Sequence, residues 1–267
     1  MISLFSVSFS YLPGKPLISD LSMRIERDSP VAILGPDGSG KSTLAKLIAG
    51  LLEPHSGSVV VSEDSHVPVG YIGGDPYDAL VGISVEEDLL FSLENAQVPA
   101  GEIQARLDQA LEWIGLRGME KRLTHMLSGG EQQKLALAGF LAMGTRALIL
   151  DEALSMLDTP TRRSIRSLLE ELRKDPGLTV IEIANDVEAV LAAERVIFLT
   201  SGAIVFDGRP ADFLTDERGS RWLRLTGGLG ALLEALLARR TLSFPAAEDR
   251  ELTRFLFNSI IKQYGGD

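Results

Sequence analysis

Eight consecutive residues near the N-terminus have the types and spacing that bind phosphate groups. The segment reads Gly35-Pro36-Asp37-Gly38-Ser39-Gly40-Lys41-Ser42 and fits the pattern G-x-x-x-x-G-K-[ST] in full. Glycines let the backbone turn so that successive N–H groups point at the phosphates. A glycine-rich turn that binds nothing is the alternative, but an apolar run precedes the segment and a helical pattern follows it. We therefore predict a site for the phosphates of a nucleotide, in which Lys41 reaches the β- and γ-phosphates and the Ser42 hydroxyl binds Mg²⁺.

Two carboxylates follow an apolar run further along the chain. Residues 147–150 are all apolar and lead directly into Asp151 and Glu152. In nucleotide hydrolases an aspartate at this place orients Mg²⁺ and its waters. The next acid can act as a general base toward the attacking water. Many strands end in an acidic turn, so the pair alone is a weak signal. Downstream of a phosphate-binding loop, we predict that Asp151 is a metal ligand and Glu152 is catalytic.

A buried strand and a helix must hold the phosphate-binding loop in place. Val31–Leu34 is apolar throughout and ends at Gly35, as a strand covered on both faces does. Apolar residues at helical spacing then predict a helix over residues 41–52. Strands alternating with helices indicate an α/β fold with a mainly parallel sheet. The expected strands are 3–9, 58–61, 69–72, 147–150, 179–184 and 195–199, with a hairpin at 201–202, and the pattern is helical over 85–145.

The bulk properties narrow the cellular setting. The chain has 267 residues, a formal charge of −11 and no cysteine. The negative charge disfavours nucleic acid as a partner, and the absence of cysteine excludes disulfides and thiolate metal sites. His55, His66 and His125 show no metal-ligand spacing. Neither a signal peptide nor a run of roughly 18 apolar residues is found, so we expect a cytosolic protein that reaches a membrane only through a partner.

A second motif identifies the family. Leu127-Ser128-Gly129-Gly130-Glu131-Gln132-Gln133 resembles the signature of ABC ATPases. Ser-Gly-Gly alone is more often a plain loop, but this one lies between the phosphate-binding loop and the acidic strand end. Glu131 stands where the family most often has glutamine. Ala153–Asp158 resembles the D-loop of the family, and the resemblance covers residues 3–213.

Within the superfamily, the chain looks most like the ATPase subunits of energy-coupling factor (ECF) transporters, including the cobalt and nickel branch. Residues 69–88 are similar to their pattern V-G-x-V-F-Q-N-P-x-N-Q-x-x-G-x-T-V-x-x-D. The resemblance implies an α/β P-loop NTPase fold: an ABC nucleotide-binding domain over residues 1–215, with an inserted helical subdomain over about 75–145. A small helical C-terminal domain, for dimerisation, is expected over 216–267, with helices at 229–239 and 247–264.

The resemblance also implies how the site is built and shared. Members work as head-to-tail dimers in which each ATP lies between the P-loop of one subunit and the signature of the other. The residues expected to bind nucleotide are Tyr11, which resembles the aromatic that stacks on adenine, and Gly35, Asp37, Gly38, Ser39, Gly40, Lys41, Ser42, Thr43, Ser128, Gly129 and Gly130. A second ABC ATPase and an integral membrane subunit are the implied partners. The implied location is the cytoplasmic face of the cell membrane, with residues 73–80 toward the membrane subunit.

Two positions depart from the family pattern. The glutamine that normally reaches Mg²⁺ and the attacking water aligns with Gly74, which has no side chain. The catalytic histidine expected after the strand 179–184 is replaced by Asn185, which can donate a hydrogen bond but cannot carry a positive charge. Compensation by neighbouring residues is one interpretation. The other is that this chain binds ATP but hydrolyses it slowly, while its intact signature serves a partner ATPase.

Three functions therefore stay open on the sequence. The first is the ATPase subunit of an importer for a vitamin or a transition metal ion. The second is an ATP-gated regulatory subunit with little hydrolysis of its own. The third is a soluble ABC protein outside transport. One residue has no explanation in sequence: Glu182 interrupts an otherwise apolar strand.

Overall fold

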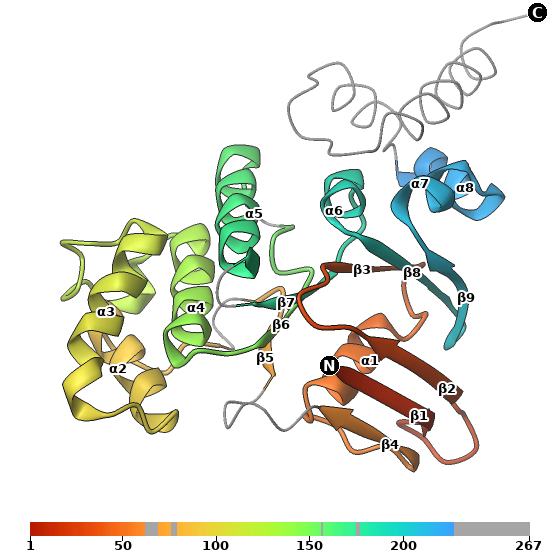
Figure 1. Cartoon of the computed structure of the whole chain (residues 1–267), viewed down its shortest axis with the longest axis horizontal. Helices are drawn as coiled ribbons and strands as arrows, with labels where there is room; N and C mark the ends of the chain where they lie inside the picture. Colours follow the sequence, from red (N-terminus) through yellow and green to blue (C-terminus); the bar gives the residue numbers. More distant parts are fainter. Residues whose placement is uncertain (62–68, 76–78, 156, 175–176, 227–267) are drawn as a thin grey trace, which may run out of the picture.

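The computed structural model describes residues 1–61, 69–75, 79–155, 157–174 and 177–226 (Figure 1). Its centre is a six-stranded sheet with the order β5-β6-β7-β3-β8-β9. All neighbouring strands are parallel except β8 and β9, which form the predicted antiparallel hairpin. The strand bounds are β5 Gly70–Ile72, β6 Ala147–Asp151, β7 Thr179–Ile183, β3 Val31–Leu34, β8 Arg195–Thr200 and β9 Ala203–Gly208. The prediction of a mainly parallel α/β sheet is confirmed.

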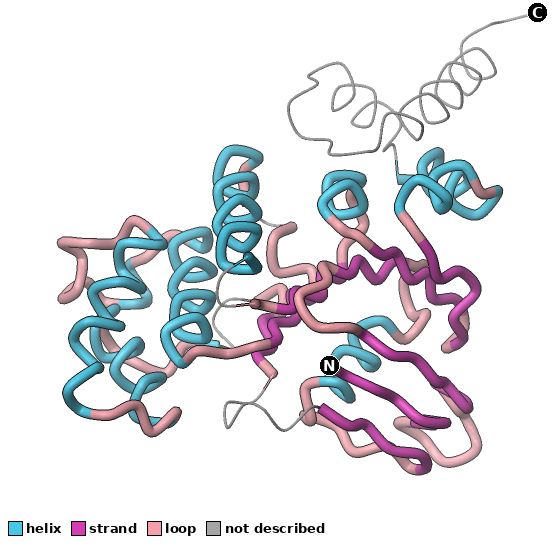
Figure 2. The backbone as a smooth tube through the Cα atoms, viewed as in Figure 1, coloured by secondary structure: helices cyan, strands magenta, loops and turns pink. Residues whose placement is uncertain are grey.

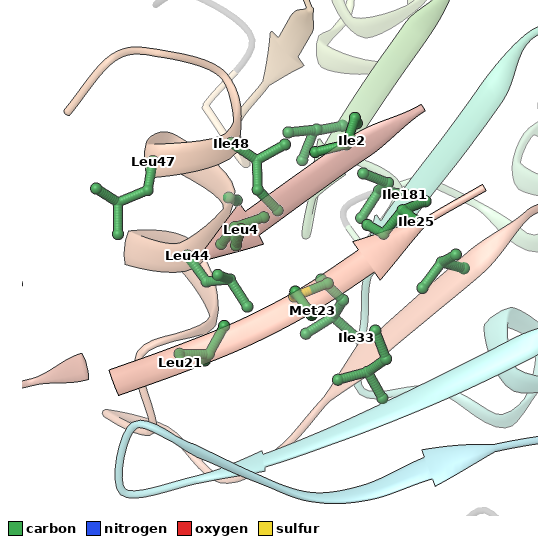
Figure 3. Packing of buried hydrophobic residues seen from close by; sticks show 14 of the residues in the cluster. Ile2, Leu4, Leu21, Met23, Ile25, Ile33, Leu44, Leu47, Ile48 and Ile181 are labelled. Atoms are coloured by element: carbon green, nitrogen blue, oxygen red, sulfur yellow. The ribbon is translucent and has the colours of Figure 1, made fainter. Parts of the chain in front are cut away.

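A second, antiparallel sheet of three strands packs beside the first, as the magenta segments of Figure 2 show. Its strands are β2 Ile18–Ile25, β1 Ile2–Phe9 and β4 Ser56–Val61, with β1 in the middle. Helix α1, Lys41–Ile48, shares one buried apolar cluster with strands of both sheets. Figure 3 shows Leu44 and Ile48 of this helix facing Leu4 and Ile2 of β1. The core therefore fixes α1, whose first residue belongs to the phosphate-binding motif.

The predicted helix over residues 41–52 is shorter in the structure. It ends at Ile48, with Ala49 as its C-cap. Gly50 follows with a φ of 72°, which is left-handed backbone that glycine adopts without strain and that ends an α-helix. The apolar spacing through Leu51 was misleading, because Leu51 is exposed rather than part of the helix's buried face.

Three longer helices form a group on one side of the central sheet (Figure 1). They are α2 Val85–Asn95, α3 Ala100–Ile114 and α4 Gly129–Met143, and they share an apolar cluster of their own. Ser84 caps α2 by accepting a hydrogen bond from the N–H of Glu87. Glu86, Glu87 and Asp88 lie in the first turn of α2, where their negative charge suits the positive end of the helix dipole. The helical content expected over residues 85–145 is present.

Helices α5 Thr159–Lys174, α6 Val187–Ala192, α7 Pro210–Thr215 and α8 Glu217–Thr226 lie on the opposite side of the central sheet from α1 (Figure 1). Phe213 of α7 is fully buried, and the ring centroid of Trp222 in α8 lies 5.9 Å from its own. Both belong to a cluster that includes Leu34 of β3. Helix α8 is thus packed on the same core as the central sheet. The helices expected at 229–239 and 247–264 lie outside the described residues, and the domain boundary at 216 stays a prediction.

Some sequence predictions fall on other parts that the structure leaves undescribed. These are His66, residues 76–78 of the motif over 69–88, and Met156 of the predicted D-loop. Within the part of the chain that is described, no helix is long and apolar enough to cross a membrane.

Candidate nucleotide site

The phosphate-binding motif connects the end of β3 to the start of α1. A Cβ atom at Gly35 would lie 2.1 Å from the carbonyl oxygen of Leu199 on β8, so this turn requires glycine. Gly40 is the N-cap of α1 with a φ of 100°. Lys41 is 5% exposed, and its Nζ donates hydrogen bonds to the carbonyl oxygens of Gly35 at 2.9 Å and Pro36 at 3.1 Å. The lysine is therefore folded over the loop, its charge held where phosphates would lie.

The loop contains further polar groups that suit a phosphate. Ser39 is buried, and its hydroxyl has no hydrogen-bond partner within the described residues. Asp37 is exposed, with its carboxylate 4.0 Å from the Lys41 ammonium. Gly38 has a φ of 73°, in the left-handed region. The motif thus adopts the turning backbone that its glycines predict.

The carboxylate of Asp151 is held by two hydroxyl groups. Ser42 Oγ donates to its Oδ1 at 3.1 Å, and Tyr71 Oη donates to its Oδ2 at 2.7 Å. Asp151 is buried at the end of β6, two strands from the β3 strand that leads to the motif. A hydroxyl and a carboxylate placed together form the hard oxygen ligand set that Mg²⁺ prefers. The residues present therefore fit the predicted magnesium ion.

Glu152 lies at the same edge of the sheet. Its φ is 55°, and its N–H donates to the carbonyl oxygen of Ile183, the last residue of β7, at 2.9 Å. Its own carbonyl oxygen accepts from Ser155 Oγ at 2.6 Å, so its backbone is anchored while its side chain is exposed. Asn185 is exposed and follows β7 after one residue. The carboxyl ends of β3, β6 and β7 therefore gather the motif, the acidic pair and Asn185, as parallel strands do.

Position 74 faces the backbone of the acidic pair. A Cβ atom at Gly74 would lie 3.9 Å from the carbonyl oxygen of Asp151 and 4.0 Å from that of Glu152, which is ordinary van der Waals contact. Gln133 of α4 fixes the neighbouring backbone: its Nε2 donates to the carbonyl oxygens of Gly73 at 3.1 Å and of Ala153 at 2.7 Å. The site therefore has space for a side chain at residue 74.

An exposed aromatic ring stands next to the start of α1. Tyr11 is 60% exposed, and its hydroxyl lies 3.3 Å from the hydroxyl of Thr43. Its ring meets that of Phe9 edge-on, with the centroids 5.0 Å apart. An exposed aromatic ring beside the phosphate-binding motif is suited to stacking on a base.

The signature begins α4, on the far side of β5 and β6 from α1 (Figure 1). Ser128 is the N-cap, and with Glu131 it forms a complete capping box. The Glu131 carboxylate accepts from the Ser128 N–H at 2.7 Å and from its hydroxyl at 2.8 Å, and these bonds hold the pKa of Glu131 below its usual range. Gly129 has open space where a Cβ would be. The structure thus separates the signature from the motif of the same chain.

A pocket of about 210 Å³ opens beside the signature. Its lining combines the signature with the segment around Asp158: Ser128, Gly130, Glu131, Lys134, Leu157, Asp158 and Thr161. A Cβ at Gly130 would lie 3.3 Å from Leu157 Cδ2, so a larger residue there would press on this wall. Both stretches named as the signature and the D-loop in sequence thus contribute to one concave surface.

A group of ion pairs close to Asn185 explains why the acidic residue Glu182 stands in an otherwise apolar strand. Arg166 of α5 donates to Glu182 Oε1 at 2.6 Å, to both oxygens of Asp186 at 3.2 Å and to Glu188 Oε2 at 3.1 Å. Burial lowers the pKa of Arg166, but the carboxylates of Glu182 and Asp186 outweigh it and raise that pKa, so the guanidinium stays charged. Asp186 also caps α6 through the N–H of Ala189. Arg166 therefore contacts Glu182 of β7, before Asn185, and Asp186, directly after it.

Comparison with known proteins decides the family. Residues 18–155 match the family described as ABC transporter. The chain belongs to the ABC transporter family. It is therefore an ABC ATPase, and the fold class and the ATP binding expected from the sequence are confirmed at the level of the family.

Curated relatives of this ABC ATPase are ECF proteins. The ECF transporter ATP-binding protein EcfA1 of Mycoplasmoides gallisepticum is 35% identical, over 84% of this chain and 84% of its own. The protein EcfA of Methanothermobacter thermautotrophicus is 37% identical, over 81% and 73%. The resemblance to ECF ATPases is confirmed.

Solved structures of ABC proteins agree with this fold. The structure of cbiO1 from Clostridium perfringens, described as part of the ABC transporter complex cbiONQ, has a TM-score of 0.72 at 30% identity and covers 87% of this chain and 98% of that one. A dimeric bacterial ABC transporter cassette has a TM-score of 0.69 at 25% identity and covers 79% and 99%.

Three residues of this ABC ATPase escaped the sequence analysis. Tyr71 reaches the metal-site aspartate, although its only signal was a hydroxyl near the end of a strand. Gln133 lies in the signature, but its two carbonyl partners come from segments distant in sequence. Arg166 shares a helical face with Arg162, which also pairs with Asp186. Two arginines four residues apart on one helix face, together with an unexplained acid in an apolar strand, could have indicated the ion pair between Arg166 and Glu182.

Proposed function

We propose that this chain binds and hydrolyses Mg-ATP and energises an ECF-type importer of a vitamin or a transition metal ion. The observation that carries the proposal is the hydrogen bond from Ser42 to Asp151, beside a buried Lys41. Magnesium would neutralise phosphate charge at this point. Lys41 would bind the β- and γ-phosphates, the loop N–H groups would orient them, and Glu152 would accept a proton from the attacking water.

The partners follow from the exposed signature. A pocket lined by Ser128 and Gly130, on the far side of the sheet from the motif, suits the nucleotide of a second ABC ATPase. A membrane subunit is proposed because the relatives are named ECF transporter ATP-binding proteins. The chain would then be peripheral, on the cytoplasmic face of the membrane. A formal charge of −11 argues against nucleic acid as a partner.

The chain's own site is proposed to be the weaker of two in a heterodimer. Gly74 offers no side chain to Mg²⁺ or to water, although a side chain would fit there. Asn185 cannot be cationic as charge develops on the γ-phosphate. Loss of one such donor typically slows turnover by about 10²–10³-fold. These two residues also favour the second candidate, an ATP-gated subunit with little hydrolysis of its own.

Nucleotide binding tests the first part of the proposal. Calorimetry with a non-hydrolysable ATP analogue is expected to show saturable, Mg²⁺-dependent binding, which Lys41→Ala weakens strongly. Lys46→Ala, on the same helix outside the motif, is the matched control and should bind normally. No binding by the unmodified chain would contradict the proposal.

Co-purification tests the partners. Extraction of the chain from detergent-solubilised membranes is expected to recover an integral membrane protein and a second ABC ATPase, both identified by mass spectrometry. Recovery of the chain with neither would exclude the transporter assignment and favour a soluble ABC protein.

A further inference from the structure

The hydroxyl group of Tyr71 contacts Asp151, the proposed metal ligand, and no role in nucleotide or metal binding has been assigned to Tyr71 above. It is the middle residue of β5, which pairs in parallel with β6 and places Tyr71 opposite Ile149. Its hydroxyl reaches Asp151, two residues further along β6, and donates to Oδ2 at 2.7 Å. The other oxygen of the same carboxylate accepts from Ser42. The tyrosine and the proposed metal ligand Ser42 thus hold opposite oxygens of one carboxylate.

The position of the Tyr71 hydroxyl is fixed by packing. The side chain is half-buried and packs against the apolar cluster that contains Ile149. The turn after β5 passes close to the Tyr71 ring. A Cβ at Gly73 would lie 3.7 Å from a ring carbon of Tyr71 and 3.9 Å from its hydroxyl oxygen. A tyrosine side chain has two main torsions and little entropy to lose. The donor is therefore preorganised before any ion or nucleotide arrives.

The carboxylate of Asp151 needs such a donor. The terminal torsion of aspartate is broad and roughly two-fold, so the plane of an unsupported carboxylate rotates easily. A hydroxyl hydrogen bond to a charged carboxylate is short and strong compared with a neutral one. With Oδ2 held by the phenol, Oδ1 is turned toward the Ser42 hydroxyl, where Mg²⁺ is expected. Groups that orient a metal ligand from behind commonly determine about 10–100-fold in metal affinity or activity.

We propose that Tyr71 is a positioning residue for the magnesium site, acting through the Asp151 carboxylate. The inference rests on the proposed function, because it assigns a role toward the metal of that same site. Tyr71 itself would touch neither nucleotide nor metal. The turn that contains Gly73 passes the Tyr71 ring, and the next residue is Gly74, where the usual glutamine is missing.

The variant Tyr71→Phe removes the hydroxyl and keeps the ring. Titration of Mn²⁺ into the purified chain with a non-hydrolysable ATP analogue, followed by electron paramagnetic resonance, measures the metal affinity directly. We expect the variant to bind Mn²⁺ about tenfold or more weakly. Binding of the analogue in EDTA should be unchanged, because the phosphate contacts of the loop are untouched. A melting temperature of Tyr71→Phe close to that of the unmodified chain would show that the aromatic ring still packs in the same place.

Two controls separate positioning from packing. Ile149→Val trims the residue opposite Tyr71 and leaves the hydroxyl bond in place, so metal affinity should match that of the unmodified chain. Asp151→Asn removes the carboxylate charge; if Tyr71 acts through it, Tyr71→Phe adds little further loss in this background.

Each result decides a different claim. Metal affinity of Tyr71→Phe within twofold of the unmodified chain would overturn the inference, as would an equal loss in the Asp151→Asn background. If either of these results is found while the unmodified chain still binds the nucleotide analogue in a metal-dependent way, the inference about Tyr71 fails and the proposed function stands. If the unmodified chain binds the analogue but Mn²⁺ has no effect on it, the magnesium site and the role of Tyr71 are both wrong.

Discussion

Replacing Arg166 with methionine tests how the loop that carries Asn185 is held. The arginine side chain is 11% exposed and faces the carboxylates of Glu182, Asp186 and Glu188 at 2.6–3.2 Å. Methionine keeps much of the apolar stem and removes the charge. Glu182 would then remain buried in β7 without its ion pair. Breaking a buried pair in this way costs about 3–5 kcal/mol of unfolding free energy.

Urea denaturation followed by circular dichroism measures this loss. For a denaturant slope near 3 kcal/mol per molar, the midpoint of Arg166→Met should fall by about 1–2 M. The double variant Arg166→Met/Glu182→Leu is expected to recover most of the loss, because an apolar pair of similar volume is often as stable as a buried ion pair.

Either of two results would refute this reasoning. A loss below about 1 kcal/mol for Arg166→Met would mean that Glu182 is solvated or neutral in the folded chain. A double variant no more stable than Arg166→Met would mean that the arginine contributes through its packing and its other partners. Arg163→Met is the matched control: its side chain is exposed and pairs only with Glu188 among the contacts described, so its midpoint should barely move.

Three smaller predictions follow from single contacts. Gly202→Ala should strongly lower the melting temperature, because Gly202 has a φ of 75° and an added Cβ would lie 1.7 Å from the carbonyl oxygen of Leu17. Gly74→Ala should leave the melting temperature nearly unchanged, because the added Cβ has space. Ser128→Ala should cost about 1 kcal/mol in urea unfolding through loss of the α4 cap; no loss would mean that the capping box contributes nothing. Burial, opposed by the N–H groups of Gly82 and Val81, raises the pKa of Asp88. A carboxyl with a raised folded-state pKa favours folding fully below about pH 4, and that contribution is lost as the pH rises through the folded pKa. In urea titrations, Asp88→Asn should therefore gain stability relative to the unmodified chain as the pH rises from 4 to 7. If the stabilities of the two proteins change with pH in the same way, the raised pKa of Asp88 is contradicted.

The parts predicted well from sequence are those set by local pattern. Residues 147–150 are apolar throughout and lead into two acids, so strand β6 and its functional end could be recognised without the fold. The phosphate-binding motif has fixed spacing, and its glycines determine a backbone that the structure reproduces. Each signal lies within a short stretch of consecutive residues, 147–152 and 35–42, where local chain geometry constrains the outcome.

The parts missed depend on contacts between distant segments. Tyr71 and Asp151 are 80 residues apart, and only the pairing of β5 with β6 brings them together. Glu182 looked out of place because its partner lies on a different element, the helix α5. The end of α1 was misjudged because apolar spacing continues past Gly50, where a left-handed residue ends the helix. Strand pairing and helix docking are properties of the whole chain, so single-sequence patterns did not reveal them.

Steady-state ATP hydrolysis tests the central claim most directly: that this chain binds Mg-ATP at its own motif but hydrolyses it slowly. The purified chain would be compared with the double variant Gly74→Gln/Asn185→His, at saturating Mg-ATP and equal concentrations of folded protein. Restoring the two missing groups is predicted to raise turnover by about 10²-fold, in line with the usual effect of one such donor. Equal turnover by the two proteins, at a rate typical of transporter ATPases, would contradict the claim.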